Sequence, residues 1–161
     1  MLKLPAMNLL LVTSFACLLL HLCGAQTCPD GWRNFEKSCY LYVDEHCNWL
    51  DAKAICEALR SSLVEISSSE ENSFVASIVQ LHNDRSVWCG LQDLAEDGHF
   101  VWTSSLEKPD YINWVPDQPD EDGGNEDCVE VLNNGQWNDE QCVDYRSYPL
   151  CEQPAVGEPI G

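Results

Sequence analysis

The chain has 161 residues, of which 27 are Asp or Glu and only 8 are Lys or Arg, so its formal net charge is −19. Nucleic-acid phosphates and anionic membrane surfaces repel a chain this acidic, which excludes both as its main partners. A length of this order is typical of one domain.

Residues 1–25 have the pattern of a secretory signal peptide. Lys3 precedes an apolar run over 9–22, and small residues follow up to Ala25, after which we expect cleavage. A retained signal anchor is the alternative, but the run is shorter than the roughly 20 residues of a membrane-spanning helix. We therefore expect a secreted, extracellular protein with no membrane insertion. Its domain would cover residues 26–153, followed by a flexible tail at 154–161.

Ten cysteines occur in the sequence, and eight of them follow the signal peptide. An even number in an exported chain indicates a disulfide framework. Zinc binding is the alternative, but the chain has no C-x-x-C pair and its cysteine spacings are too irregular for a zinc finger or ribbon. The eight are Cys28, Cys39, Cys47, Cys56, Cys89, Cys128, Cys142 and Cys151.

Two helices are predicted in the first half of the domain. Apolar residues at three- and four-residue steps give the first helix one buried face, formed by Trp49, Ala52, Ile55, Cys56 and Leu59. Ser68 and Glu71 form a capping box that begins a second helix. The buried stripe of this second helix consists of Phe74, Val75, Ile78, Val79 and Leu81.

Short strands are predicted after the helices, at 87–91, 100–103, 129–132 and 148–151, because these runs are rich in aromatic and β-branched residues. Asn134-Gly135 is a typical hairpin turn. Two helices followed by short strands indicate an α+β fold. Residues 103–127 show no clear helix or strand, and so long a loop in a compact domain is usually functional.

Carboxylates are concentrated in and just after this loop. They repel one another unless a cation offsets their charge, and oxygen ligands at this density favour Ca²⁺ over Mg²⁺ or zinc. A solvated acidic loop that only aids solubility is the alternative, and no EF-hand pattern occurs. The seven carboxylates are Asp117, Asp120, Glu121, Asp122, Glu126, Asp127 and Glu130.

Several short motifs follow one another in a specific order. In the first half they are Trp49-x-x-Ala52-x-x-x-Cys56, Leu63-Val64-x-Ile66 and Ser69-Glu70-Glu71-Asn72-x-Phe74. In the second half they are Trp88-Cys89-Gly90-Leu91, Asn113-Trp114, Gln118-Pro119-Asp120, Glu126-Asp127-Cys128, Trp137-Asn138-Asp139 and the closing Cys142 and Cys151. With these motifs, residues 28–152 resemble a C-type lectin-like domain in its long form. The resemblance implies two helices, small antiparallel sheets and a long calcium-binding loop, held by disulfides.

The resemblance also implies two calcium sites. The first would bind both the ion and a sugar, through Gln118, Asp120, Glu126, Asn138 and Asp139, with a cis peptide bond before Pro119. The second, structural site would use Asp93, Asp97, Glu121 and Asp127, with Glu126 shared. Common members have Glu at the position of Asp97 and Asp at the position of Glu121. For Trp137, core packing is favoured over sugar contact.

Disulfide pairing is implied in the same way. The family pattern gives Cys28–Cys39, Cys56–Cys151 and Cys128–Cys142. Cys47 and Cys89 lie outside that pattern. An internal Cys47–Cys89 bond is the first choice, and a bridge between two chains through Cys47 is the second.

The function implied by the resemblance is that of a secreted, calcium-dependent carbohydrate-binding lectin, acting in glycan recognition or agglutination in innate immunity. In the family, the Gln-Pro-Asp motif is typical of members that bind galactose or N-acetylgalactosamine. Strongly galactose-selective members have Trp where this chain has Asp122. Mannose is therefore expected as a second ligand. Agglutination needs two sites per particle, which would require a homo-oligomer. The alternative is a non-sugar member of the fold, a calcium-mineral matrix or ice-binding protein.

An enzyme is not expected. The sequence has no nucleophile motif such as G-x-S-x-G. Paired carboxylates hydrolyse glycosides in other proteins, but carboxylates that hold a metal ion cannot readily act as acid and base.

Overall fold

The computed structural model describes residues 26–82 and 86–157. The expected signal peptide at 1–25 and the last four residues of the expected tail lie outside the described residues. Within the described part, no helix is long and apolar enough to cross a membrane.

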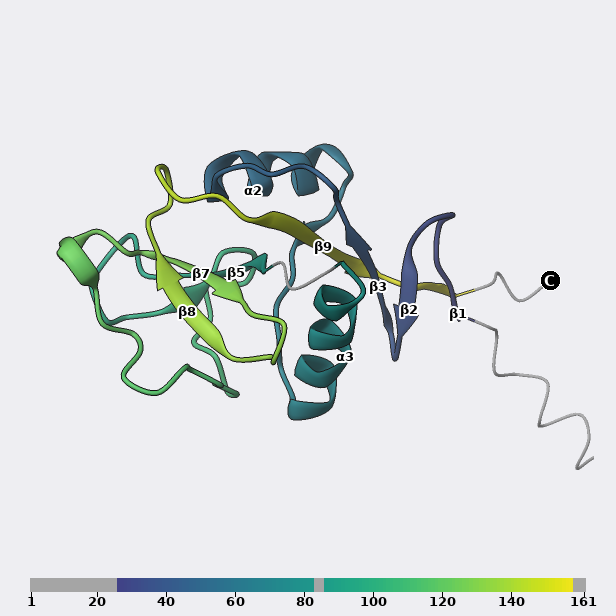
Figure 1. Cartoon of the computed structure of the whole chain (residues 1–161). Coiled ribbons are helices and arrows are strands. Elements are labelled where there is room, and N and C mark those ends of the chain that lie inside the picture. Colours follow the sequence, from purple (N-terminus) through teal and green to yellow (C-terminus); the bar gives the residue numbers. More distant parts are fainter. Residues whose placement is uncertain (1–25, 83–85, 158–161) are drawn as a thin grey trace, which may run out of the picture.

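Among the described residues, two helices pack with one mixed sheet of eight strands, and a separate two-stranded sheet joins the chain ends (Figure 1). The helices are α2 (Trp49–Ala58) and α3 (Ser69–Gln80). The main path of the sheet runs in the order β2-β3-β9-β5-β7-β8, and β4 and β6 pair with β9 and β5. Its strands are β2 (Arg33–Phe35), β3 (Ser38–Tyr42), β4 (Ser62–Leu63), β5 (Val87–Gln92), β6 (Val101–Trp102), β7 (Cys128–Val131), β8 (Trp137–Glu140) and β9 (Tyr148–Pro154).

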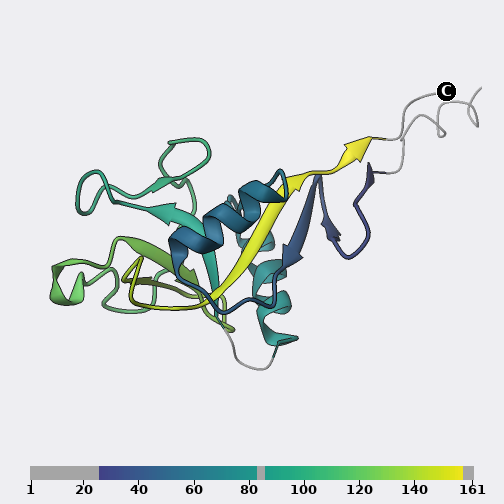
Figure 2. The same ribbon diagram turned by 90° about the horizontal axis from the view of Figure 1, so that it is seen from above.

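The predicted α+β fold is confirmed. The small antiparallel sheets expected from the resemblance are joined into one, because β5 pairs with β9 in parallel while the other pairs are antiparallel. The chain ends also differ from the prediction, since β9 continues to Pro154 and β10 (Val156–Gly157) pairs with β1 (Gln26–Thr27). Residues 154–157 are therefore part of the fold. This pair lies at the opposite end of the molecule from the long loop (Figures 1 and 2).

The first turn of each helix is capped by a side chain. Asn48 accepts a hydrogen bond from the backbone N–H of Asp51 at 2.8 Å, and Ser68 accepts one from Glu71 at 3.2 Å. The predicted cap at Ser68 is confirmed. Glu71, however, accepts from the backbone N–H of Ser67 at 2.8 Å, one residue earlier than in a capping box.

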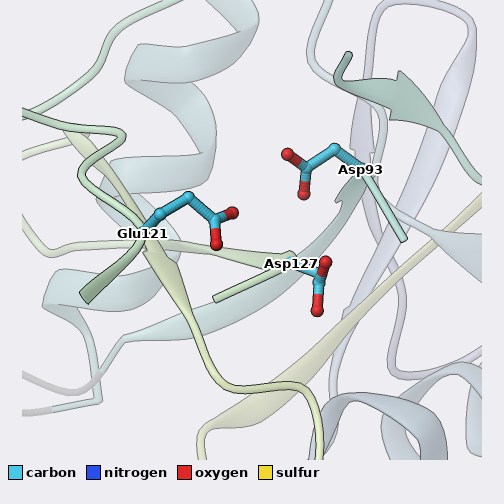
Figure 3. A group of neighbouring side chains, drawn as sticks. All are labelled: Asp93, Glu121 and Asp127. Atoms are coloured by element: carbon cyan, nitrogen blue, oxygen red, sulfur yellow. The ribbon is translucent and has the colours of Figure 1, made fainter. Parts of the chain in front are cut away.

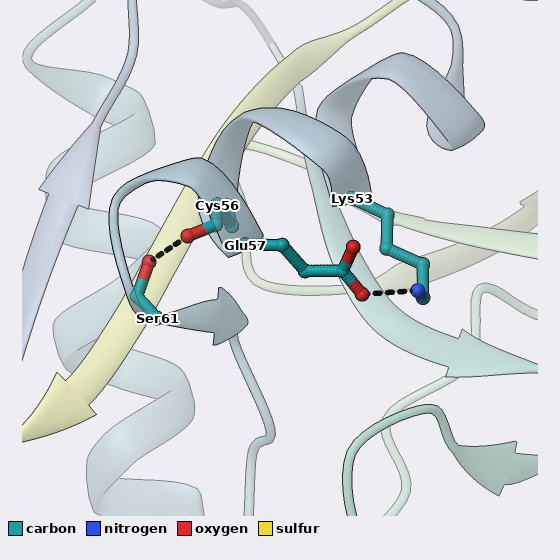
Figure 4. Close-up of polar contacts among 4 residues, drawn as sticks. All are labelled: Lys53, Cys56, Glu57 and Ser61. Atoms are coloured by element: carbon teal, nitrogen blue, oxygen red, sulfur yellow. Dashed lines mark hydrogen bonds and ion pairs between the residues drawn. The ribbon is translucent and has the colours of Figure 1, made fainter.

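Both helices end earlier than the apolar pattern predicted. Leu59 and Leu81 lie at the C-cap positions and are 41% and 60% exposed, so their assignment to the buried stripes was wrong. After Leu59 the chain turns away at Arg60, which has a φ of 59°. Ser61 Oγ donates to the carbonyl of Cys56 at 2.7 Å and so satisfies one carbonyl of the last turn (Figure 4). Figure 4 also shows the surface ion pair of Lys53 and Glu57 on the same helix.

The core consists of two clusters that meet at β5. Trp88 packs with Trp49 and Ala52 in one cluster, whereas Cys89 packs with Val129 in the other. Adjacent residues of a strand point to opposite faces, which places these two neighbours in different clusters. The indole N–H of Trp49 joins the two clusters, because it donates to the carbonyl of Cys89 at 2.8 Å. The indole N–H of Trp88 donates to the carbonyl of Cys47 at 3.0 Å within its own cluster.

Three of the four expected disulfides are present, namely Cys28–Cys39, Cys56–Cys151 and Cys128–Cys142. The expected Cys47–Cys89 bond is wrong, since both thiols are free and buried. The reason is the alternation along β5. The thiol of Cys89 points into the cluster of Val129, whose carbonyl accepts from it at 3.3 Å, whereas Cys47 belongs to the cluster of Trp88.

The two thiols are expected to be unreactive in the native protein. Burial raises the pKa of Cys47 to about 11 and that of Cys89 to about 12, so the reactive thiolate is scarce at neutral pH. A thiol reagent should label neither residue in native protein and both after unfolding without reductant. In Cys89→Ala, the unfolded protein should have one labelled cysteine, Cys47. Absence of labelling in unfolded protein would show that the two cysteines are oxidised.

Candidate metal and ligand site

The long loop between β6 and β7 is held on the fold by Trp137. The backbone N–H of Trp137 donates to the backbone carbonyl of Asn113 at 2.8 Å. The backbone carbonyl of Trp137 accepts from the backbone N–H of Val115 at 2.9 Å. Three aromatic rings of the β6 strand and the loop pack edge-on against its fully buried indole, those of Trp102, Tyr111 and Trp114. The predicted core role of Trp137 is therefore confirmed. Apart from the 3₁₀ turn η1 (Asp122–Gly124) and an isolated bridge, the loop has no regular structure, as predicted.

Helix α3 and the loop both contact the turn between β7 and β8. Gly135 has a φ of 82°, which favours glycine, and its N–H donates to the carbonyl of Leu132 at 2.9 Å. Its own carbonyl accepts from the amides of Asn72 and Asn113 at 2.9 and 2.7 Å. Asn72 also accepts from the indole N–H of Trp137 at 2.8 Å. These bonds fix β8 and the loop relative to each other.

The structure brings together the three carboxylates expected at the first site. One oxygen from each of Asp120, Glu126 and Asp139 lies within 4.8 Å of the others. Backbone N–H groups hold two of these side chains. Glu121 donates to Asp139 Oδ2 at 3.1 Å, and Asp122 donates to Glu126 Oε2 at 3.0 Å.

Two amide side chains complete the expected set of ligands. The peptide bond between Gln118 and Pro119 is cis, as predicted. The Oε1 atom of Gln118 is buried and has no hydrogen-bond partner among the described residues. Asn138 precedes Asp139 on β8, and its Nδ2 atom donates to Glu140 Oε1 at 3.2 Å. The side-chain oxygen of Asn138 is therefore not engaged by Glu140.

A second carboxylate group consists of Asp93, Glu121 and Asp127, with one oxygen of each within 4.8 Å of the others (Figure 3). Gly98 donates its backbone N–H to Asp93 Oδ2 at 2.7 Å. The Oδ1 atom of Asp93 and the Oε1 atom of Glu121 are buried and have no partner among the described residues. Three of the four residues expected at the second site therefore meet.

The fourth expected residue, Asp97, is not in this group. It is exposed in the turn after β5, where the N–H of Gly98 and not the Asp97 carboxylate reaches Asp93. Asp97 still acts at a distance, because its charge contributes to raising the pKa values of Asp93 and Glu121. Glu126, expected in both sites, lies in the first group, and its backbone N–H donates to Glu121 Oε2 at 3.4 Å.

Electrostatic cost is common to both groups. Burial raises the pKa values of Asp93, Glu121, Glu126 and Asp139, and the neighbouring carboxylates raise them further. A buried oxygen without a partner is also costly. A divalent cation would offset both costs. All the donors are carboxylate and amide oxygens, which is the donor set that suits Ca²⁺.

A third acidic region was not predicted from the sequence. Glu65, Glu71 and Glu152 line a pocket of about 410 Å³ beside β3 and β9. Glu71 accepts from the hydroxyl of Tyr40 at 2.6 Å, and Glu152 accepts from the backbone N–H of Glu65 at 3.1 Å. These bonds give the carboxylates a structural role. No spacing pattern could reveal the region, because its residues are far apart in the chain.

Comparison with known proteins agrees with this architecture. The family model for the lectin C-type domain matches residues 45–153. The chain belongs to this family. Its lectin domain is 38% identical over 131 residues to the low affinity immunoglobulin epsilon Fc receptor of Mus musculus, with 81% of this chain and 38% of the relative covered. It is 36% identical over 137 residues to the hepatic lectin of Gallus gallus, with 84% of this chain and 63% of the relative covered.

Solved structures show the same fold over the whole of the matched domain. The carbohydrate-recognition domain of cow CD23, studied in the presence of a GlcNAc2Man3 oligosaccharide, has a TM-score of 0.76 and 36% identity, covering 82% of this chain and 99% of that one. The mouse scavenger receptor C-type lectin domain has a TM-score of 0.75 and 35% identity, covering 81% of this chain and 100% of that one.

The relatives include lectins and a carbohydrate-recognition domain, and the family generally binds Ca²⁺. The homologues are not enzymes, which agrees with the expectation for this chain. The chain spans between 38% and 63% of the length of the two curated relatives named above.

Asp93→Asn tests the cost of the second carboxylate group. In EDTA, this variant of the lectin domain should be about 1 kcal/mol more stable to urea unfolding than the wild type, because it removes a buried charge that lies beside two other carboxylates and has one oxygen without a partner among the described residues. In saturating calcium the wild type should be the more stable of the two, because the variant has lost a charged ligand. Asp110→Asn, an exposed carboxylate on the long loop, should match the wild type in both buffers. A wild type more stable than Asp93→Asn in EDTA would contradict the proposed repulsion.

Proposed function

We propose that the chain is a secreted, calcium-dependent lectin that binds galactose-type sugars. The observation that supports this most strongly is the first group of oxygens. Asp120, Glu126 and Asp139 converge, and the buried oxygen of Gln118 beside the cis bond has no partner within the described part. A bound cation would offset the repulsion within such a set, and the family is one that generally binds Ca²⁺.

In this proposal the five residues of the first site hold the ion and leave coordination places for two sugar hydroxyls. Three carboxylates against one divalent ion leave a charge of about −1, so the site keeps strong acceptors for hydroxyl protons. The bound ion would supply direct coordination of the sugar. The second group would hold another ion, which would order the loop. The residues of the first site are Gln118, Asp120, Glu126, Asn138 and Asp139.

The choice of galactose rests on Gln118-Pro119-Asp120. Gln118 can donate a hydrogen bond through its amide, whereas Asp120 can only accept. In the Glu-Pro-Asn motif of mannose-type members the order is the reverse, because Glu can only accept and Asn can donate. Hepatic lectin and asialoglycoprotein receptor 2 are among the relatives of this chain. Asp122 is exposed in η1 and gives no aromatic face for the apolar side of galactose. We therefore propose galactose as the preferred sugar, with mannose as a weaker ligand.

One lectin domain supplies one sugar site, so agglutination of particles would require a homo-oligomer. Secretion follows from the signal-peptide pattern at 1–25. A secreted lectin of this kind would act in glycan recognition in innate immunity.

Sugar binding is expected to require calcium. The protein should bind galactose resin in calcium and elute in EDTA, because the hydroxyls coordinate the ion. Glu126→Gln should weaken calcium binding roughly tenfold or more, since ligand charge sets affinity. Asp110→Asn should bind like the wild type. Retention of the wild type in excess chelator would overturn the calcium mechanism, and an unchanged Glu126→Gln would show that the ligand set is wrong.

Exchange of the motif tests sugar preference. Competition of galactose against mannose should favour galactose in the wild type. The double variant Gln118→Glu/Asp120→Asn should favour mannose, because the donor and acceptor ends are exchanged. Calcium affinity measured on both proteins controls for damage to the site. If both proteins prefer the same sugar, the motif does not determine selectivity here.

A further inference from the structure

The amide of Asn138 lies beside two carboxylates. Residues two apart on a strand share a face, which places Asn138 and Glu140 on the same side of β8. Asn138 Nδ2 donates to Glu140 Oε1 at 3.2 Å. On the neighbouring strand β7, Glu130 stands directly opposite Asn138 in the antiparallel register, which places the two side chains on the same face of the sheet.

Two carboxylates beside one amide determine which way the amide is turned. An amide has a donating nitrogen and an accepting oxygen, and carboxylates can only accept. If the side-chain oxygen of Asn138 faced Glu130 and Glu140, the hydrogen bond from Asn138 to Glu140 would be lost and three acceptors would lie together. The nitrogen therefore faces the carboxylates. The oxygen of Asn138, which the proposed first site needs as a ligand, stays on the other side of the amide group.

Glu130 is a buried carboxylate and Glu140 a half-buried one. Glu130 is only 3% exposed, and its Oε2 atom has no hydrogen-bond partner among the described residues. Its Oε1 atom accepts from the Tyr145 hydroxyl at 3.4 Å. In the part of the chain that the structure describes, neither carboxylate forms an ion pair. Two adjacent carboxylates without a cation destabilise the fold, so stability alone does not account for them.

We infer that Glu140, together with Glu130 on the neighbouring strand, is a positioning residue that fixes the Asn138 amide in the orientation required for cation and sugar binding. This inference deepens the proposed function and rests on it. Hydrogen bonds to metal ligands from surrounding groups commonly set ligand orientation, and their loss lowers metal affinity by roughly tenfold to a hundredfold.

Substitutions at position 140 separate the hydrogen bond from the charge. Glu140→Val removes both, whereas Glu140→Gln keeps an acceptor oxygen within reach of Asn138 and removes only the charge. Asp110→Asn removes an exposed charge of the long loop and serves as the control. Calcium affinity by calorimetry should fall about tenfold in Glu140→Val. It should stay within about threefold of wild type in Glu140→Gln, and Asp110→Asn should match the wild type. Glu140→Thr, a second truncation suited to a strand, repeats the test if Glu140→Val does not fold.

A spectroscopic readout reports on the amide itself. The two Nδ2 protons of Asn138, assigned by their loss in Asn138→Asp, should shift in Glu140→Val in metal-free protein and stay near their wild-type positions in Glu140→Gln. Equal calcium affinity in Glu140→Val and wild type would overturn the inference. Equal losses in Glu140→Val and Glu140→Gln would also overturn it, because charge alone would then explain the effect. If the wild type binds no calcium, the proposed function fails, while the amide spectrum still shows whether Glu140 orients Asn138.

Discussion

Repulsion between carboxylates is the constraint on which the functional end of this molecule depends. In each of two groups, carboxylates from the long, irregular loop lie within a few ångströms of one from the sheet side, Asp139 on β8 or Asp93 after β5. Such a loop would spread apart if only its own backbone held it. The fold keeps the groups together by attaching both sides of the loop to rigid elements, and the remaining electrostatic cost is what the proposed hard cation would offset.

Strand β8 provides most of this attachment. Its first residue, Trp137, is surrounded by aromatic rings and hydrogen-bonds the loop on both sides of Trp114. The next two residues, Asn138 and Asp139, are proposed ligands. The Cys128–Cys142 disulfide joins the start of β7 to the segment after β8. Core packing and ligand placement are therefore properties of the same short strand, so damage to the packing of Trp137 would also disturb the proposed site.

Local patterns and ordered motifs predicted much of the fold. The cap at Ser68, the turn at Asn134-Gly135 and the helix faces depend on neighbouring residues, which the sequence shows directly. Three disulfides, the cis bond and the two acidic groups came from the family resemblance, because that resemblance carries tertiary information. The exposed ends at Leu59 and Leu81 were missed because periodicity does not mark where a helix stops.

Other errors arose where two distant segments had to be placed against each other. Cys47 and Cys89 were paired because they were the two left over, whereas the alternation of β5 places them in different clusters. Asp97 was assigned to the second site by the family resemblance, whereas the turn leaves its side chain exposed and outside the carboxylate group. The contacts of Glu140 and Glu130 with Asn138 could be seen only once the register of β7 and β8 was known.

Calorimetric titration of metal-free protein with calcium, in the presence and absence of galactose, tests the central claim most directly. Coupling between two ligands is reciprocal, so a sugar that coordinates the ion must tighten calcium binding to the same site. The account predicts two ions per chain, with galactose raising the affinity of one of them. Absence of saturable calcium binding, or calcium binding that galactose leaves unchanged, would contradict it.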